Sequence, residues 1–185
     1  MQELSLNVLD VAQNSVSAGA TLIQIEVDID TARKRMTISI EDNGRGMDDE
    51  TQKRVCDPFY TTRTTRKVGL GLPFFKLAAE QAGGGLTIRS ALGKGTRVEA
   101  VFRLGHIDLA PLGDMASTVA NLIQCDPDID FLYTIRADGE AFCLDTRQLR
   151  EMLGEVSLAE AQIALFIQEY IRENSIHLQN RSTQL

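Results

Sequence analysis

The stretch EDNGRGM, residues 41–47, constrains the fold of this chain more than any other. Apolar residues occupy every second position over residues 36–40 just before it, which predicts a strand with one buried face. The strand delivers the carboxylate of Asp42 into a turn, where Gly44 and Gly46 allow a ligand to approach the backbone closely. Taken alone, however, the Asn-Gly pair indicates an ordinary tight acidic turn. The rest of the chain must decide between a turn and a binding site.

Composition indicates an ordinary globular protein. Hydrophobic residues make up 43% of the 185 residues, and no run reaches the roughly 18 apolar residues that a membrane span needs. The cysteines at positions 56, 125 and 143 are widely spaced and form no CxxC pair, so neither a zinc site nor a disulfide framework is expected. We therefore expect a cytoplasmic protein that does not bind a membrane.

Charge divides the chain into two parts. Residues 1–105 hold 14 Lys and Arg against 13 Asp and Glu, whereas residues 106–185 hold five Arg, no Lys and 13 Asp and Glu. Phosphate contacts require cations, so the second part disfavours nucleic acid as a partner. Because the sequence pattern also changes around His106–Pro111, we predict a first domain over 1–105. Residues 106–185 then form a small acidic α+β domain, a candidate for binding a partner protein.

A helix is predicted over residues 2–18, with an apolar stripe at helical spacing. Asp10 and Asn14 lie four residues apart and therefore share one polar face of this helix. Most amphipathic helices have such a face simply because it is solvated. The functional alternative is that the two side chains point at a metal or a phosphate, since carboxylate and amide oxygens are suitable ligands for Mg²⁺.

The segment DPFYTTRTTRKVGLGL, residues 57–72, joins a rigid aromatic turn to a basic stretch and a glycine loop. The basic stretch has no apolar residue, so we expect it to be mobile until a ligand supplies negative charge. The glycine loop leads into a helix predicted over residues 73–82. Free N–H groups and the helix dipole make such a helix start an anion site, although a plain flexible loop explains the glycines equally well. The spacing is neither that of a Walker A loop nor that of a dinucleotide fold.

Periodicity places the remaining elements. Strands are predicted over residues 21–30, 34–41, 86–90, 96–103, 131–136 and 141–144. Further helices are predicted over residues 49–55, 112–125 and 147–153, and a long one begins at a capping box of Ser157 and Glu160 and ends near Asn174.

The order of these motifs closely resembles that of the GHKL superfamily. This superfamily includes sensor histidine kinases, type II topoisomerases, mismatch-repair ATPases, large heat-shock chaperones and anti-sigma-factor kinases. The polar-faced helix, DNGRGM, DPFYTTR, VGLGL and GKGT follow one another over residues 1–104. The resemblance implies an α/β (α+β) fold, a two-layer Bergerat-type sandwich with a mixed sheet, which binds ATP with Mg²⁺. The short lid is most like that of the ATP-binding domain of sensor histidine kinases.

The resemblance also implies a role for each motif. Asn14 would coordinate Mg²⁺, Asp42 would accept a hydrogen bond from the adenine amino group, and glycines 44 and 46 would shape that pocket. The other nucleotide-binding residues that it implies are Thr96 near the adenine, Arg63, Arg66 and Lys67 in the lid, Gly69 and Gly71 at the phosphates, and Met47, Leu70 and Leu72.

Two departures from the family pattern bear on the reaction. Asp10 stands where the family's hydrolases and serine kinases usually have a glutamate general base, so a shorter carboxylate must act as the base or in the outer shell of the metal. No histidine precedes residue 106, and no dimerising helical hairpin precedes the first helix. Autophosphorylation by this chain alone is therefore not expected, and His106 and His177 are expected to be surface or structural residues.

Three functions stay open. The first, which we favour, is a kinase that acts in trans on a separate protein. The second is a slow ATPase switch that regulates a partner held by residues 106–185. The third is an ATP-binding regulatory module without turnover. In each case the expected ligand is ATP and the expected further partner is a protein.

Overall fold

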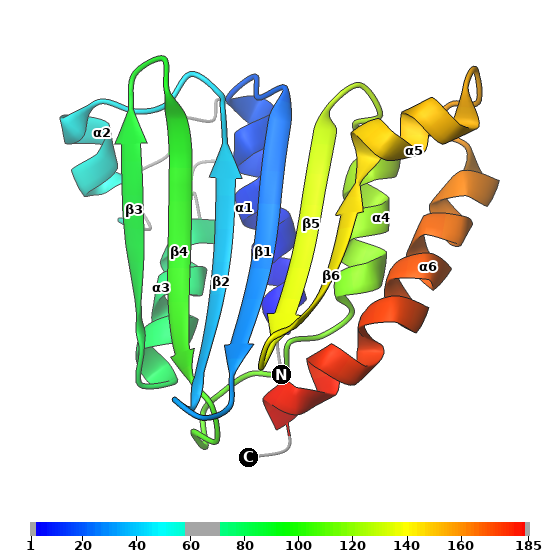
Figure 1. Cartoon of the computed structure of the whole chain (residues 1–185). Coiled ribbons are helices and arrows are strands. Elements are labelled where there is room, and N and C mark those ends of the chain that lie inside the picture. The colour runs from blue at the N-terminus through cyan, green and yellow to red at the C-terminus, as the bar shows by residue number, and fades with distance from the viewer. Residues whose placement is uncertain (1–2, 58–70, 184–185) are drawn as a thin grey trace.

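The computed structural model describes residues 3–57 and 71–183, which form one mixed six-stranded sheet backed by helices (Figure 1). The strands are β1 (Leu22–Asp30), β2 (Arg35–Asp42), β3 (Gly85–Ala91), β4 (Gly95–Arg103), β5 (Asp130–Ala137) and β6 (Glu140–Asp145). The helices are α1 (Leu4–Ser17), α2 (Asp49–Arg54), α3 (Gly71–Gln81), α4 (Met115–Cys125), α5 (Thr146–Leu153) and α6 (Ala161–Gln179), followed by the 3-10 turn η1 (Asn180–Thr183).

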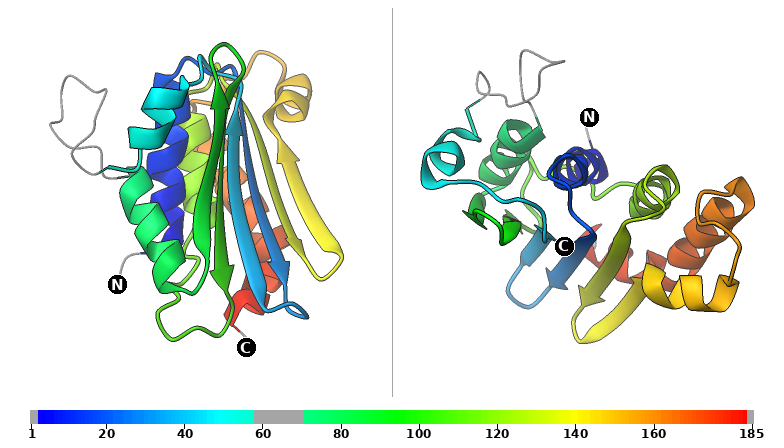
Figure 2. Two further views of the ribbon diagram at one scale, coloured as in Figure 1. Left: turned by 90° about the vertical axis from the view of Figure 1, so that its left-hand side faces the viewer. Right: turned by 90° about the horizontal axis from the view of Figure 1, so that it is seen from above.

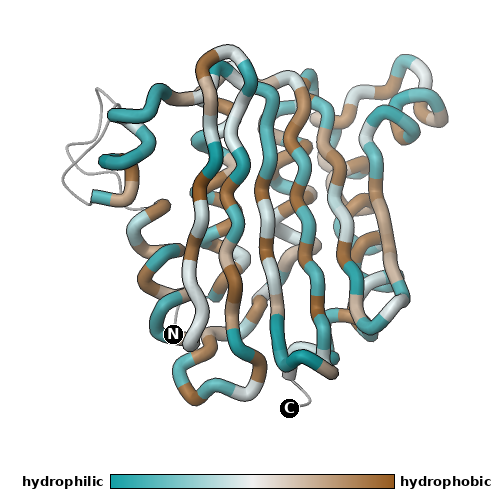
Figure 3. Tube along the Cα trace, turned by 60° about the vertical axis from the view of Figure 1, so that its left-hand side comes forward, coloured by the Kyte–Doolittle hydropathy of each residue, from teal (hydrophilic) through white to brown (hydrophobic). Residues whose placement is uncertain are grey.

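The two layers follow from the alternation of apolar residues along the strands. Every second residue of β1 is buried, and the colouring of Figure 3 shows the same alternation of hydrophobic and hydrophilic residues along neighbouring strands. Helices α1, α3 and α4 cover the apolar face of the sheet (Figure 2), and α6 packs against α4, β5 and β6. The predicted two-layer α+β fold with a mixed sheet is therefore confirmed.

The strand order is β3-β4-β2-β1-β5-β6, and β1 with β5 is its parallel pair. Ile23 lies opposite Phe131 and Val27 opposite Ile135, and all four side chains are buried. The other neighbouring pairs are antiparallel. The sheet thus runs without a break from the first part of the chain into the second. The boundary predicted at residue 105 falls in the connection between β4 and α4, and the division into two domains stays a prediction.

The connection before α4 is fastened to the start of α1. The N–H of Leu4 donates to the carbonyl of Pro111 at 3.0 Å, and the N–H of Ser5 donates to the carbonyl of Leu112 at 2.8 Å. These bonds satisfy helix N–H groups that have no partner within the helix. They also hold α4 beside α1.

The predicted capping box at the start of the last helix is wrong. Glu160 is the N-cap residue of α6, but its side chain makes no capping hydrogen bond. The hydroxyl of Ser157 instead accepts a bond from the N–H of Ala159 at 3.2 Å, within a turn that precedes the helix. The helix also ends at Gln179, beyond the predicted Asn174. None of the described helices is both long enough and apolar enough to cross a bilayer.

Candidate functional site

Asp42 occupies the end of β2 on the side that faces the helices. Its side chain is only 8% exposed, because the buried alternation of Met36, Ile38 and Ile40 continues through it. The Gly44 N–H donates to Oδ1 at 2.9 Å. Helix α1 provides a second hydrogen-bond donor to this carboxylate, and the carboxylate oxygens can still accept a third hydrogen bond.

Ser15 of α1 supplies that second donor. Its hydroxyl donates to Oδ2 of Asp42 at 2.6 Å, and both side chains are buried. The bond joins residues 27 positions apart and connects the helix to the strand end. Ser15 was not predicted as a site residue. Its spacing from Val8, Val11 and Ala12 places it on the buried stripe of the helix, where a hydroxyl needs a partner, so the signal was present in the sequence.

The two glycines of the turn are required by close packing. Gly46 has a φ of +67°, and a Cβ there would lie 2.0 Å from the carbonyl oxygen of Ala91. A Cβ at Gly44 would lie 3.0 Å from both Ala18 Cβ and Asp42 Oδ1. The turn is therefore held between the α1–β1 loop and the end of β3 without room for side chains.

The opposite wall of the site comes from the β3–β4 hairpin. Thr96 pairs with Asp42 in the antiparallel register of β4 and β2. The Met47 N–H donates to Ser90 Oγ at 2.8 Å, and this oxygen lies 2.9 Å from both Thr96 Oγ1 and the carbonyl oxygen of Gly95. Ser90 thus connects two of the predicted residues, although no sequence pattern singled it out.

The start of α3 lies against the polar face of α1. A Cβ at Gly71 would lie 3.1 Å from Asp10 Cβ and 3.9 Å from Asn14 Nδ2. Leu72 follows it and is buried. The structure therefore brings Asp10, Asn14 and Gly71 into one cluster. Since Ser15 follows Asn14 directly, α1 connects this cluster to Asp42.

The oxygen atoms that this cluster can offer as metal ligands suit a Mg²⁺ ion that is also coordinated by phosphate. Across residues 3–57 and 71–183, no three His, Cys, Asp or Glu side chains come together as a metal site. Asp10 and Asn14 offer one carboxylate and one amide oxygen. Protein sites for Mg²⁺ often supply only one or two ligands and leave the remaining positions to phosphates and water. The residues present therefore fit the ion that the resemblance implied.

Five predicted site residues lie outside the described residues: Arg63, Arg66, Lys67, Gly69 and Leu70. The other nine surround the end of β2 and the start of α3: Asp10, Asn14, Asp42, Gly44, Gly46, Met47, Gly71, Leu72 and Thr96. Their individual roles stay predictions.

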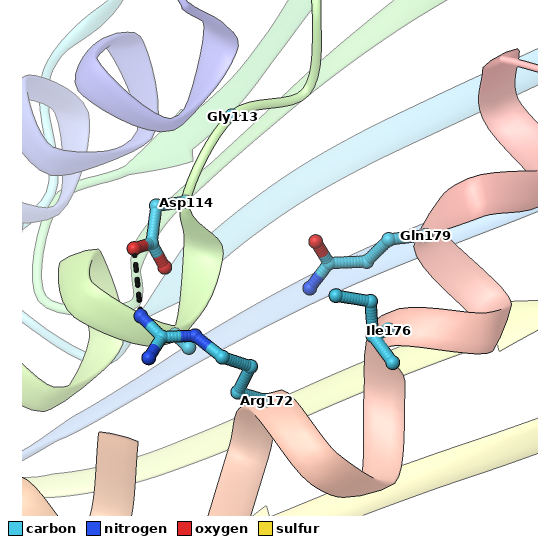
Figure 4. A pocket seen from close by; sticks show the side chains of 6 residues that line it. Gly113, Asp114, Arg172, Ile176 and Gln179 are labelled. Carbon is cyan, nitrogen blue, oxygen red and sulfur yellow. Dashed lines mark hydrogen bonds and ion pairs between the residues drawn. The ribbon is translucent and has the colours of Figure 1, made fainter. Parts of the chain in front are cut away.

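A separate cavity of about 260 Å³ lies between α4 and α6 (Figure 4). It is lined by Gly113, Asp114, Ala116, Arg172, Ile176 and Gln179, none of which is a predicted site residue. Asp114 caps α4 by accepting from the Ser117 N–H at 2.9 Å, and it pairs with Arg172 at 3.0 Å. Burial acts to raise the pKa of Asp114, but the bonds from Ser117 and Arg172 together lower that pKa below its ordinary value.

The fold and the cluster around α1 define an ATPase-type domain of the GHKL superfamily. Residues 1–106 match the family model described as "Histidine kinase-, DNA gyrase B-, and HSP90-like ATPase", and the chain belongs to this family.

The relatives it resembles include sensor proteins. It is 38% identical over 109 residues to a putative sensor protein of Shewanella frigidimarina, and 36% identical over 105 residues to the sensor protein kinase FleS of Pseudomonas aeruginosa. These matches cover 58% and 57% of this chain but only 17% and 25% of the relatives. The crystal structure of the N terminal domain of a DNA repair protein is similar in fold, with a TM-score of 0.54 and 16% identity, over 78% of this chain and 53% of that one.

Proposed function

We propose that this chain binds ATP with Mg²⁺ between β2, the β3–β4 hairpin and α1, and that it acts as a protein kinase in trans. The observation that carries the proposal is the buried carboxylate of Asp42, which Ser15 and Gly44 hold in a fixed orientation. One fixed acceptor among mostly apolar neighbours selects an N–H donor, such as the adenine amino group. The glycine turn lets the base approach the backbone.

The phosphates would lie at the start of α3. This 11-residue helix begins at Gly71, so its dipole and free N–H groups favour an anion beside Asp10 and Asn14. Asn14 would coordinate Mg²⁺, which supplies charge neutralisation to the triphosphate. Asp10 is exposed and is therefore free to accept the proton of an incoming hydroxyl or to order water in the outer shell of the ion.

Exposed apolar side chains on the same two helices support a protein substrate. Phe74 and Leu77 are exposed three residues apart on α3, and the exposed Leu6 lies about one helical turn before Asp10 on α1. Large apolar groups that lie close together in solvent indicate a protein contact. A phosphoacceptor protein bound there would present its side chain to the phosphate end of the site. One similar protein is itself described as a sensor protein kinase.

A slow ATPase that switches a partner is the second candidate. The continuous sheet favours it, because β1 lies between β2, which carries Asp42, and β5 of the acidic segment. Closure around the nucleotide could thus alter a partner held by residues 106–185. The kinase is preferred because Leu6, Phe74 and Leu77 are exposed on the two helices that carry Asp10 and Gly71.

Nucleotide binding is tested by thermal unfolding with and without Mg²⁺ and ATP. Ligand at 100 times its Kd adds about 2.7 kcal/mol of stability, or a rise in Tm of about 5–10 °C for a chain of this size. Asp42→Asn should abolish the shift, whereas the exposed control Asp49→Asn should retain it. Equal shifts in both variants would reject the proposed adenine contact.

The reaction is tested with γ-labelled ATP, Mg²⁺ and a cell lysate. Label on a second protein identifies a kinase acting in trans, and release of free phosphate without labelled protein identifies the switch. If ATP binds but neither labelled protein nor free phosphate forms, the chain is a regulatory module without turnover. Asp42→Asn should remove any label that depends on this site.

A further inference from the structure

Helix α6 carries an exposed apolar ridge that starts at the edge of the sheet, beside β6. Leu165, Phe166 and Tyr170 are 59%, 53% and 39% exposed. The rings of Phe166 and Tyr170 stack with centroids 6.0 Å apart and planes 9° from parallel. Tyr170 also meets Phe142 of β6 edge-on at 5.5 Å. Tyr170 thus contacts both of the other rings, and the three side chains extend from β6 to solvent.

Packing within the fold does not account for this ridge. The residues of α6 that are buried against α4, β5 and β6 are different ones: Ala164, Ile167, Ile171, Ser175 and Leu178. Single exposed apolar residues are normal, but a contiguous group marks a contact surface. Although Tyr170 packs on Phe142, the area that Leu165, Phe166 and Tyr170 expose does not contribute to the core.

Acidic residues run alongside the ridge. Glu169 and Glu173 follow Leu165 at intervals of four, so they form a row beside Phe166 and Tyr170. Both carboxylates are on exposed residues, and within the described part of the chain neither forms an ion pair with a cation. We call Leu165, Phe166, Glu169, Tyr170 and Glu173 the α6 outer face.

Arginines of the same segment do not neutralise this face. Each of the five pairs with a carboxylate elsewhere: Arg136 with Glu26, Arg147 with Asp145, Arg150 with Asp130, Arg172 with Asp114, and Arg181 with Asp138 and Glu140. Within the described residues, none of these arginines therefore neutralises Glu169 or Glu173.

We propose that the α6 outer face binds a basic amphipathic helix of a partner protein. Side chains four residues apart form a ridge that packs into the groove of a second helix. Lysine or arginine flanking the apolar stripe of that helix would meet Glu169 and Glu173. A second copy of this chain is a poorer occupant, because it would place the same carboxylates opposite one another. The proposal does not depend on nucleotide binding.

A designed peptide provides the probe. A labelled helical peptide of about 18 residues, with leucine on one face and lysine on the other, is titrated with the full chain by fluorescence anisotropy. The double variant Phe166→Ala/Tyr170→Ala should weaken binding on the order of tenfold or more. The matched control Leu92→Ala/Ile107→Ala removes two exposed apolar side chains elsewhere and should bind as the wild type does. Thermal unfolding checks that both variants remain folded.

Charge is tested separately. Glu169→Lys should weaken binding more than Asp128→Lys, which makes the same change of net charge on an exposed residue outside α6. A peptide with glutamate in place of lysine should not bind. The proposal is overturned if the basic peptide fails to bind, if both peptides bind equally, or if the two charge reversals act alike. A dimer that sedimentation detects and Phe166→Ala/Tyr170→Ala dissolves would assign the face to a second copy instead.

Discussion

The hydroxyl of Ser15 donates a 2.6 Å hydrogen bond to the carboxylate of Asp42 and so connects α1 to the end of β2. Ser15→Ala removes one of two donors from a buried carboxylate, which costs about 1–3 kcal/mol of folding stability. We expect a lower urea midpoint and weaker ATP binding, because the carboxylate is less firmly oriented.

Ser17→Ala is the matched control for this change. Ser17 lies on the same helix, but it is exposed, and its hydroxyl donates to the carbonyl of Gln13 at 2.9 Å. Loss of the hydroxyl should leave both the urea midpoint and ATP binding close to the wild type, because the carbonyl of Ser17, which accepts from Arg45 at 2.6 Å, is unchanged. Equal effects of the two variants would show that the bond between Ser15 and Asp42 has no special part in the site.

Two glycines with similar backbone angles should respond very differently to alanine. Gly46 and Gly93 have φ values of +67° and +72°, but a Cβ at Gly46 meets Ala91, whereas a Cβ at Gly93 meets nothing within 4 Å. Gly93→Ala should therefore cost only the backbone strain, about 1–2 kcal/mol. Gly46→Ala must also displace the end of β3, so it should lower the urea midpoint much further. Similar midpoints would contradict the close packing of the turn.

Asp10 should affect turnover without affecting the fold. It is exposed and lies against Gly71, so Asp10→Asn should leave the melting temperature of the free protein unchanged. If Asp10 is the general base, turnover should fall about 10²–10⁴-fold while the ATP-dependent thermal shift is retained. Asp10→Glu should preserve activity, since it restores the carboxylate length usual at this position. Full activity in Asp10→Asn would exclude the general-base role.

Stability should fall in acid partly through Asp114. The pKa of its carboxyl is lower in the folded protein than the ordinary value of 3.8. The charged form therefore adds stability that is complete above that value and is lost as the pH falls through the folded pKa. Asp114→Asn keeps a side chain that caps helices well but removes the charge. Asp114→Asn should be less stable than the wild type near pH 6. The difference in free energy of unfolding, measured with urea, should shrink as the pH falls to about 3.

Asp114→Ala separates the cap from the charge. It removes both, so its free energy of unfolding should be about 1 kcal/mol lower than that of Asp114→Asn at every pH. A pH profile of Asp114→Asn parallel to that of the wild type would mean that the bonds from Ser117 and Arg172 do not stabilise the charged form.

Local pattern was sufficient for much of the fold and site. Alternation over residues 36–40 placed Asp42 on the buried face at the end of a strand, and the four-residue spacing of Asp10 and Asn14 placed both on one face of a helix. These features depend on periods of two and 3.6 residues, which a sequence displays directly. The structure confirmed the resulting arrangement.

Contacts between distant segments were not predictable in the same way. Nothing local indicates that Ile23 pairs with Phe131, because the two residues are 108 positions apart and parallel strands are joined by a long crossover connection. The role of Ser90 likewise arises from a bond to Met47, 43 residues away. The Ser157–Glu160 pattern failed for a local reason, since the hydroxyl found a nearer N–H within a turn.

The parallel pairing of β1 and β5 also has a consequence for synthesis of the chain. β1 ends at Asp30 and β5 begins at Asp130, so one edge of β1 remains open until 100 further residues have been made. At about 5–20 residues per second, ribosomes leave that apolar strand edge bare for about 5–20 s. An open edge of this kind invites pairing with other nascent chains. Residues 106–185, which supply β5, therefore cover this edge only after β1 to β4 have been synthesised. A chain truncated after residue 106 is expected to aggregate.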